Sequence, residues 1–287
     1  MTQTTPTNHT HAHTYSHTLD AYSVNHLKTW RQCPKKFELA LERRLNWPSD
    51  PKNFRLGKGV HQLLDYRASG LAIEAIVAAS DADIALGYQR LAESPWGQAN
   101  VVASEWGFSL CLPDEDGSHS RWIYGRVDRI VRHPTDPKQV VILDWKTGTR
   151  IPQQIETDWQ TRIYLLAVYL SRHDLGLAGL ELEQLAMTYV KFNPHTEGAP
   201  EDEAVLPIET ATVPYTDALH ADTLTRLTDS FRAIDHARLS GHYALPRRCP
   251  DRHCPYRHVC GIQAQPQAGP PMESDTQNRY TEDLLPF

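Results

Sequence analysis

Between Tyr22 and about residue 98, apolar positions recur at the spacing that is typical of helices. Ser23 is a candidate N-cap, and the apolar residues from Leu27 to Leu41, set among basic ones, predict one or two short helices. A further helix is expected to begin near Gly59, and the alanine-rich stretch 71–98 is also expected to be helical. The first part of the chain is therefore predicted to consist of helices.

The next segments alternate apolar and polar residues and contain many β-branched and aromatic side chains, which is typical of strands. They are VVASEWGFSLCL, WIYGRVDRIV and QVVILDWK, separated by the turn DEDGSH and the polar loop HPTDPK. We expect these three strands to form a meander.

Helix and strand alternate again in the last part of the chain. Thr157 or Asp158 is expected to cap a helix through WQTRIYLLAVYL, AMTYVKF predicts a fourth strand, and residues 217–240 predict a last long helix. The resulting order of elements, α, β, β, β, α, β with flanking helices, predicts an α/β fold.

The composition is that of a globular domain with two polar ends. The chain has 287 residues, of which 40% are hydrophobic, enough to bury a sizeable core. Residues 1–20 are rich in Thr and His, and residues 263–287 are rich in Pro and polar side chains, so we expect both to be disordered tails. The remaining residues, 21–262, are expected to form a single domain.

Charge and targeting signals narrow the function classes. The 29 Lys and Arg residues stand against 35 Asp and Glu, so the net charge of −6 argues against a protein that coats nucleic acid indiscriminately. Any polyanion must therefore meet a local basic patch. The sequence has no apolar run long enough to span a membrane and no secretory pattern, so we expect a cytoplasmic protein. It also lacks a GxxxxGK[ST] phosphate loop, so ATP-driven unwinding would require another chain.

Two carboxylates are predicted to meet across one hairpin. The HPTDPK loop is centred near residue 136, and Asp128 and Asp144 lie eight residues on either side of it. A symmetric antiparallel hairpin places them opposite each other on one face, where like charges are destabilising unless a cation compensates them. Lys146 follows Asp144 by two residues, so period-two alternation places it on the same face.

This arrangement suits phosphodiester hydrolysis. Paired carboxylates bind Mg²⁺ or Mn²⁺, and a neighbouring ammonium can orient a metal-bound water while the ion polarises a phosphoryl oxygen. The alternative is that the two aspartates form ordinary surface ion pairs with Arg126, Arg129 and Lys146. Hairpin geometry alone leaves both interpretations open.

Several spaced motifs resemble the PD-(D/E)XK nuclease superfamily, in particular its RecB-type branch, which includes the AddB nuclease domain and CRISPR-associated adaptation nucleases. In chain order the motifs are GKGVHQLLD, GRVDRI, ILDWKTG and WQTRIY. The resemblance covers about residues 22–262 and implies a restriction-endonuclease-like core, with a mixed sheet flanked by helices.

The resemblance also implies roles for single residues. It makes His61, Asp128 and Asp144 ligands of Mg²⁺ or Mn²⁺ and makes Lys146 the catalytic lysine. Gln160 and Tyr164, one helical turn apart, match the QxxxY motif and are further catalytic candidates that can approach the active site or the DNA. Glu105 matches a frequently acidic position and is expected beside the metal site, not as a ligand. The alternatives are a structural histidine for His61, and a polar helix face with a core aromatic for the QxxxY pair.

The five cysteines are an odd number, which makes a disulfide scaffold a poor explanation. Cys33 stands alone, while Cys249, Cys254 and Cys260 form a tight trio. Zinc sites usually use two close pairs of cysteines, and this division does not provide them. The arrangement resembles the family's [4Fe-4S] clasp, which would join the N- and C-terminal segments.

The trio departs from the family pattern in one respect. The family usually has C-x2-C-x5-C, whereas this chain has C-x4-C-x5-C, which weakens the assignment of Cys249. A mixed zinc site that includes His253 and His258 is the alternative. The remaining cysteine, Cys111, lies in a predicted strand and is expected to be a small buried apolar residue.

Basic residues surround the predicted clasp. They would form a local basic patch for DNA phosphates, or else simply be solvated charges; they are Lys35, Lys36, Arg247, Arg248, Arg252 and Arg257. The terminal TEDLLPF resembles the C-terminal tip of bacterial single-stranded-DNA-binding proteins, so docking to a replication or repair protein is a further hypothesis.

Together these features predict a metal-dependent DNA nuclease, an exonuclease acting on single-stranded ends in DNA repair, recombination or CRISPR adaptation. The main alternative is a non-catalytic iron–sulphur module that binds DNA and partners a helicase. A zinc-stabilised structural protein is a third possibility. It would be colourless, whereas an iron–sulphur protein would be brown and absorb broadly near about 400 nm.

Overall fold

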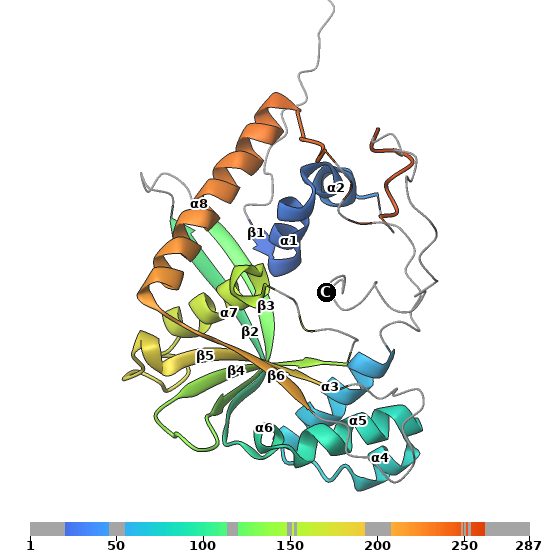
Figure 1. Cartoon of the computed structure of the whole chain (residues 1–287), viewed down its shortest axis with the longest axis vertical. Coiled ribbons are helices and arrows are strands. Elements are labelled where there is room, and N and C mark those ends of the chain that lie inside the picture. Colours follow the sequence, from blue (N-terminus) through green and yellow to red (C-terminus); the bar gives the residue numbers. More distant parts are fainter. Residues whose placement is uncertain are drawn as a thin grey trace, which may run out of the picture.

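The computed structural model describes residues 21–45, 55–113, 120–147, 151, 154–192, 208–247, 249, 251 and 254–261. Their centre is a six-stranded mixed sheet with helices on both sides (Figure 1). Its strands are β1 (Ala21–Ser23), β2 (Val101–Pro113), β3 (Ser120–Arg132), β4 (Val140–Lys146), β5 (Leu185–Lys191) and β6 (Glu209–Pro214). The fold is α/β, as predicted, while both predicted tails lie outside the described residues.

The helices agree closely with the pattern of the sequence. They are α1 (Val24–Gln32), α2 (Pro34–Phe37), a π-helical turn (Glu38–Glu42), α3 (Arg55–Ala68), α4 (Glu74–Ala79), α5 (Ala82–Glu93), α6 (Pro95–Gln98), α7 (Trp159–Leu170) and α8 (Asp217–Ser240), with 3₁₀ turns at Ile155–Thr157 and Leu182–Gln184. The side chain of Ser23 caps α1, and Asp158, not Thr157, caps α7. None of the described helices combines the length and hydropathy needed to cross a bilayer.

The predicted meander is confirmed, because β2 pairs antiparallel with β3 and β3 pairs antiparallel with β4. Strand β5 then runs parallel to β4, and β6 runs antiparallel to β5. The sequence pattern missed β1 and β6. Strand β1 has three residues, too few for an alternation to be recognised, and β6 is an edge strand with a single buried residue.

Strand β3 has a gap along one edge. Strand β2 covers its other edge, so β1 and β4 must share this one. Strand β1 pairs in parallel with residues 122–124, and β4 pairs with residues 129–132. Residues 125–128, which we call the β3 gap, lie between these two pairings without a strand partner on that side among the described residues.

The two faces of the sheet are buried in separate cores. Along β4, Val140 and Ile142 face the cluster that contains α1, α7 and α8. Val141, Leu143 and Trp145 face the cluster formed with α3 and α5. Figure 1 shows these two groups of helices on opposite sides of the strands. Because side chains alternate, Asp144 and Lys146 belong to the face of β4 that α7 covers.

Two glycines allow α3 and α5 to pack closely. A Cβ atom on Gly59 of α3 would lie 2.6 Å from Ile84 Cδ1, and one on Gly87 of α5 would lie 2.9 Å from Val60 Cγ2. Each glycine therefore accommodates a side chain of the opposite helix. The contact holds α3, which carries His61, against α5, and both helices pack in the core on one face of the sheet.

We predict that Gly87→Val destabilises the protein by about 2–3 kcal/mol, because Val60 is fully buried and stiff and cannot move away from the added methyl groups. The measurement is urea unfolding followed by circular dichroism. Gly179→Val is the control, since a Cβ atom there meets nothing within 4 Å, and it should stay within about 0.5 kcal/mol of wild type. Equal stabilities for the two variants would contradict the prediction.

Candidate active site

Asp128 lies at the end of the β3 gap, where β4 separates from β3. The last pair of the ladder is Arg129 with Leu143, in the predicted register, which continued by one step would place Asp128 opposite Asp144. The ladder stops there, and Asp128 Oδ2 accepts the backbone N–H of Trp145 at 3.0 Å instead. A carboxylate thus takes the place of a backbone carbonyl, and its other oxygen faces the site.

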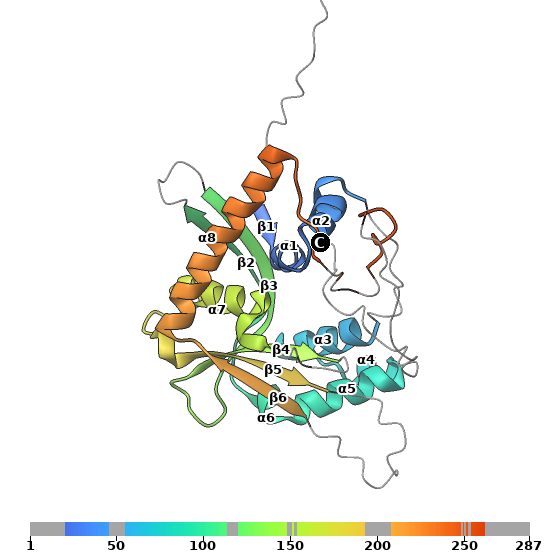
Figure 2. The same ribbon diagram turned by 45° about the horizontal axis from the view of Figure 1, so that its top comes forward.

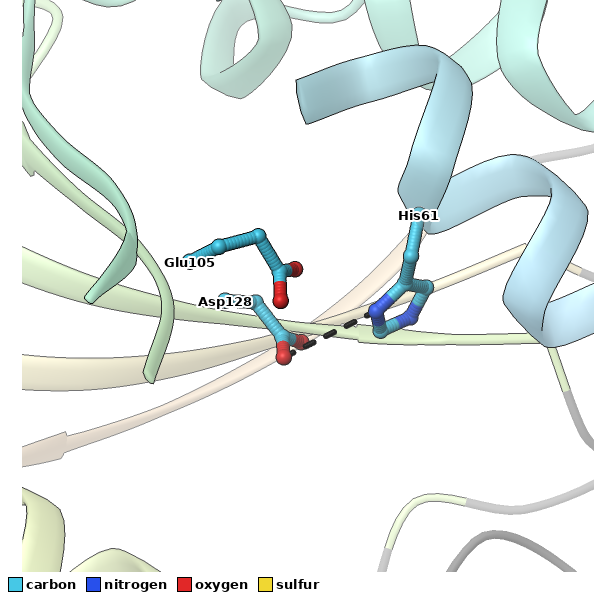
Figure 3. A group of neighbouring side chains, drawn as sticks. All are labelled: His61, Glu105 and Asp128. Atoms are coloured by element: carbon cyan, nitrogen blue, oxygen red, sulfur yellow. Dashed lines mark ion pairs between the residues drawn. The ribbon is translucent and has the colours of Figure 1, made fainter. Parts of the chain in front are cut away.

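His61 reaches the same point from α3. Its Nε2 atom lies 3.0 Å from the carbonyl oxygen of Trp145, and its Nδ1 atom lies 3.6 Å from Asp128 Oδ1 (Figure 3). A carbonyl can only accept, so Nε2 carries the proton and Nδ1 of the neutral ring presents a lone pair to the carboxylate. Two electron-rich atoms facing each other are favourable only when a cation, a proton or a metal ion, lies between them.

Glu105 completes this group from β2. The register of β2 on β3 brings it opposite Asp128, and its φ of 47° is a strained left-handed conformation for a residue other than glycine. Potential ligand atoms of His61, Glu105 and Asp128 lie within 4.8 Å of one another, and Figure 3 shows the three side chains converging. Burial, followed by the negative charge of Asp128, raises the pKa of Glu105, while Arg126 Nε at 3.1 Å opposes the shift.

Asp144 and Lys146 form the adjoining half of the site. Asp144 is 2% exposed, and its Oδ2 lies 3.0 Å from Lys146 Nζ. Its other oxygen, Oδ1, accepts a hydrogen bond from the side-chain amide of Gln160 on α7. The contact between Lys146 Nζ and Asp144 Oδ2 confirms the expectation that these two side chains share one face of the strand. Asp144 does not belong to the compact group of His61, Glu105 and Asp128, which differs from the predicted ligand set.

Tyr164 lies one turn after Gln160 on α7 and is 8% exposed. Its ring packs edge-on against Phe108 at 5.9 Å between centroids. Burial holds the pKa of the phenol well above its ordinary value, and the negative charges of Asp128 and Asp144 raise it further. Tyr164 is therefore a neutral hydroxyl in the field of both carboxylates.

The sequence also allowed surface ion pairs of the two aspartates with Arg126 and Arg129, but these arginines make other contacts. Arg126 pairs with Glu105. Arg129 is buried, donates to the carbonyl oxygen of Leu64 and lies over the ring of Trp145, 5.5 Å from its centroid. Arg129 therefore anchors α3 to the sheet, and Lys146 is the cation beside Asp144.

The first and last described segments of the chain are far apart in sequence but contact each other in the structure. Cys33 is buried and caps α2 by accepting the backbone N–H of Lys36 at 3.3 Å. Lys36 Nζ lies 3.3 Å from Asp251 Oδ2, across a separation of 215 residues. Figures 1 and 2 both place the red segment that includes residues 254–261 near α2.

A small apolar cluster strengthens this junction. Leu39, Tyr256 and Cys260 are buried together, with Cys254 packed against them. The hydroxyl of Tyr256 donates to the carbonyl oxygen of Leu45 at 2.5 Å. Burial raises the pKa of the Cys254 thiol, and the nearby Lys36 ammonium lowers it in part.

The described cysteines and His258 do not form a group of three or more ligand atoms that lie within 4.8 Å of one another. Tetrahedral zinc with bonds of about 2.3 Å would place its sulphur ligands about 3.8 Å apart. Among the described residues, which include His258 and all the cysteines but not His253, the group of ligand atoms within 4.8 Å of one another is that of His61, Glu105 and Asp128.

Cys111 is exposed, so the expectation that it is buried was wrong. Alternation along β2 buries Leu110 and turns Cys111 to the opposite face, where its partner on β3, Trp122, is also exposed. Both side chains of this pair therefore meet solvent.

Fold and site together define an α/β protein with carboxylates, a histidine and a lysine gathered where two strands separate. The sequence model of the PD-(D/E)XK nuclease superfamily matches residues 21–261, and the chain belongs to this superfamily. The mixed sheet flanked by helices agrees with the predicted fold. No curated protein matches the sequence.

Two solved structures resemble the chain. One is a proposed exonuclease from Eubacterium rectale, with 12% identity and a TM-score of 0.49, covering 87% of this chain and 91% of that one. The other is SSO0001, with 16% identity and a TM-score of 0.38, covering 76% and 78%. Both TM-scores are below 0.5, so the family assignment rests on the sequence match.

We predict that Glu105→Gln stabilises the metal-free protein at about pH 8. Because the folded protein raises the pKa of Glu105, it holds this proton more tightly than the unfolded chain does. Stability is therefore lost as pH rises from the ordinary carboxyl pKa through the raised one, and the amide removes this loss. Thermal melting in EDTA across the pH range measures the effect.

Glu93→Gln, at an exposed position of α5, is the matched control and should melt like wild type. Mn²⁺ should stabilise wild type more than Glu105→Gln, since a cation favours the ionised carboxylate. A Glu105→Gln protein that is less stable than wild type in EDTA at high pH would refute the prediction.

Proposed function

We propose that this protein is a metal-dependent DNA nuclease that hydrolyses phosphodiester bonds, acting as an exonuclease on single-stranded ends. The observation that carries the proposal is the hydrogen bond from the backbone N–H of Trp145, the residue after Asp144 in the chain, to Asp128 Oδ2 where β4 leaves β3. Lys146 Nζ lies 3.0 Å from Asp144 Oδ2. Membership of the nuclease superfamily supports the same reaction class.

The residues fit a divalent ion. His61 Nδ1 faces Asp128 Oδ1 at 3.6 Å while its Nε2 is bound to a carbonyl, which is the tautomer that a metal-binding histidine requires. The carboxylate oxygens, which are the majority of the candidate ligands, suit Mg²⁺ or Mn²⁺. We propose His61, Asp128 and Asp144 as ligands, with Glu105 as a further candidate because it belongs to the compact group.

Each side chain has a separate part in the proposed reaction. When bound, the ion would polarise the phosphoryl oxygen and offset charge on the leaving oxygen. Lys146 orients the attacking water and stabilises negative charge near Asp144. Gln160 holds Asp144 through Oδ1, and Tyr164 offers a neutral hydroxyl beside both aspartates.

The substrate would reach the site over the basic residues of α1 and α2. The chain carries a net charge of −6, so binding of DNA depends on local positive charge. Arg31, Lys35 and Lys36 lie next to the junction of the chain ends. Lys35 pairs there with Glu38 and Lys36 with Asp251, so DNA phosphates would have to compete with these carboxylates. Docking to a helicase or to a replication or repair protein is proposed from the sequence alone, since TEDLLPF lies outside the described residues.

The test is degradation of end-labelled single-stranded DNA by anaerobically purified protein with Mn²⁺ or Mg²⁺. Asp128→Ala and Lys146→Ala should each lower the cleavage rate by about a hundred-fold or more, because each removes a group that acts on the transition state. Loss of label from one end would establish the polarity of cleavage.

Lys138→Ala, at an exposed lysine of the β3–β4 loop, should cleave like wild type. If wild type and both active-site variants bind DNA but are equally inactive, the proposal that this protein is a nuclease is rejected. That outcome would favour the non-catalytic module that partners a helicase.

We further propose that Cys33, Cys249, Cys254 and Cys260 hold a [4Fe-4S] cluster that joins the two ends of the domain. The Lys36–Asp251 ion pair and the packing of Cys254 and Cys260 beside Leu39 support their approach.

The prediction for this site is about four iron atoms per protein and broad absorbance near about 400 nm. Cys33→Ser and Cys260→Ser should lose both signals and unfold more readily. Cys111→Ser, at the exposed free cysteine of β2, should keep them. A colourless protein that contains stoichiometric zinc would overturn the assignment.

A further inference from the structure

Lys28 connects helix α1 to the active site. Its Nζ atom lies 3.3 Å from Gln160 Oε1 and 3.5 Å from Asp158 Oδ1. The side chain is 13% exposed, so this ammonium is largely withdrawn from solvent. Lys28 was not a candidate in the sequence, because 132 residues separate it from Gln160.

The contact fixes which way the Gln160 amide points. An ammonium only donates, so Lys28 requires the amide oxygen on its side. The NH₂ group then points to Asp144 Oδ1, which only accepts when it is ionised. A rotated amide would place NH₂ against the ammonium and oxygen against the carboxylate, so both ends favour the same orientation.

Asp144 is oriented in turn. Gln160 engages Oδ1, which leaves Oδ2 toward Lys146 Nζ at 3.0 Å. Because Asp144 is 2% exposed, water cannot readily replace a lost amide donor. The four side chains thus alternate in polarity, from cation through amide and carboxylate to cation.

Helix α1 is itself held against the first turn of α7. Asp158 Oδ1 accepts the backbone N–H of Gln160 at 2.7 Å and also lies near Lys28. One turn further along α1, Arg31 donates to the carbonyl oxygen of Thr157. The ammonium of Lys28 is therefore placed by two elements, not by a single flexible contact.

We propose that Lys28 is a positioning residue for the nuclease reaction, which orients Asp144 through Gln160. The proposal rests on the proposed function, since it assigns Lys28 to the same site. It differs from a role in binding DNA phosphates, which would act on the substrate directly and would not require Gln160.

The test is a double-mutant cycle of Lys28→Met and Gln160→Ala, with kcat and KM measured on single-stranded DNA. Lys28→Met should lower kcat about ten-fold and leave KM within about two-fold, as expected for the loss of an outer partner of a metal ligand. The double variant should be no slower than Gln160→Ala alone. Lys28→Arg, which keeps a cationic donor, should recover most of the rate.

Lys138→Met is the control for the loss of one positive charge, and it should match wild type. Thermal melting of all variants separates misplacement of Asp144 from unfolding. A raised KM for Lys28→Met, or effects that multiply in the double variant, would assign Lys28 to DNA binding and overturn the proposal.

Mn²⁺ affinity, measured by electron paramagnetic resonance, tests the same inference without cleavage. Loss of a positive charge alone would tighten Mn²⁺ binding, whereas loss of positioning should weaken it by about ten-fold. Equal or tighter binding by Lys28→Met would reject the proposal. If wild type binds Mn²⁺ but does not cleave DNA, the proposed nuclease function is rejected. The effect of Lys28→Met on Mn²⁺ affinity would still test whether Lys28 positions Asp144.

Discussion

The backbone of Trp145 is the point on which the site depends. At the β3 gap its N–H has no ladder partner and is bound by Asp128 Oδ2, while its carbonyl oxygen binds His61 Nε2. A buried backbone group must be paired, so both side chains are held by a requirement of the fold itself. The Trp145 side chain, buried in the core with α3 and α5, keeps this backbone in place. The backbone of one residue, Trp145, thus fixes two proposed metal ligands, Asp128 and His61.

The site concentrates negative charge in a setting that would otherwise oppose it. Glu105 and Asp128 approach each other at the edge of a hydrophobic core, Asp144 lies buried beside Lys146, and burial raises the pKa of Glu105. Lys146 and Arg126 compensate part of this charge. The left-handed φ at Glu105 is strained, and the contact of His61 Nδ1 with Asp128 is favourable only with a proton or a metal ion between the two atoms. A bound divalent cation would offset the strain and satisfy this contact, which is the pattern expected of a site built for a ligand and not for stability alone.

The junction of the chain ends and the active site share helix α1. Its C-terminal end is capped by Cys33, three residues before Lys36, which pairs with Asp251 in the segment that carries the other candidate cluster ligands. Its middle contacts the first turn of α7 through Lys28 and Arg31. Any change at the junction therefore acts on the same helix that supports Gln160.

The sequence alone determined those features that depend on neighbours along the chain. The symmetric loop around residue 136 set the hairpin register, and period-two alternation placed Lys146 beside Asp144. The caps Ser23 and Asp158 marked where α1 and α7 begin, because capping is a local hydrogen bond. Only the tertiary structure decided which distant groups meet: Glu105 in the compact group with His61, the exposure of Cys111, and the contact of Lys28 with Gln160. These depend on how helices and strands pack and on a left-handed backbone at Glu105, which no spacing of residue types encodes.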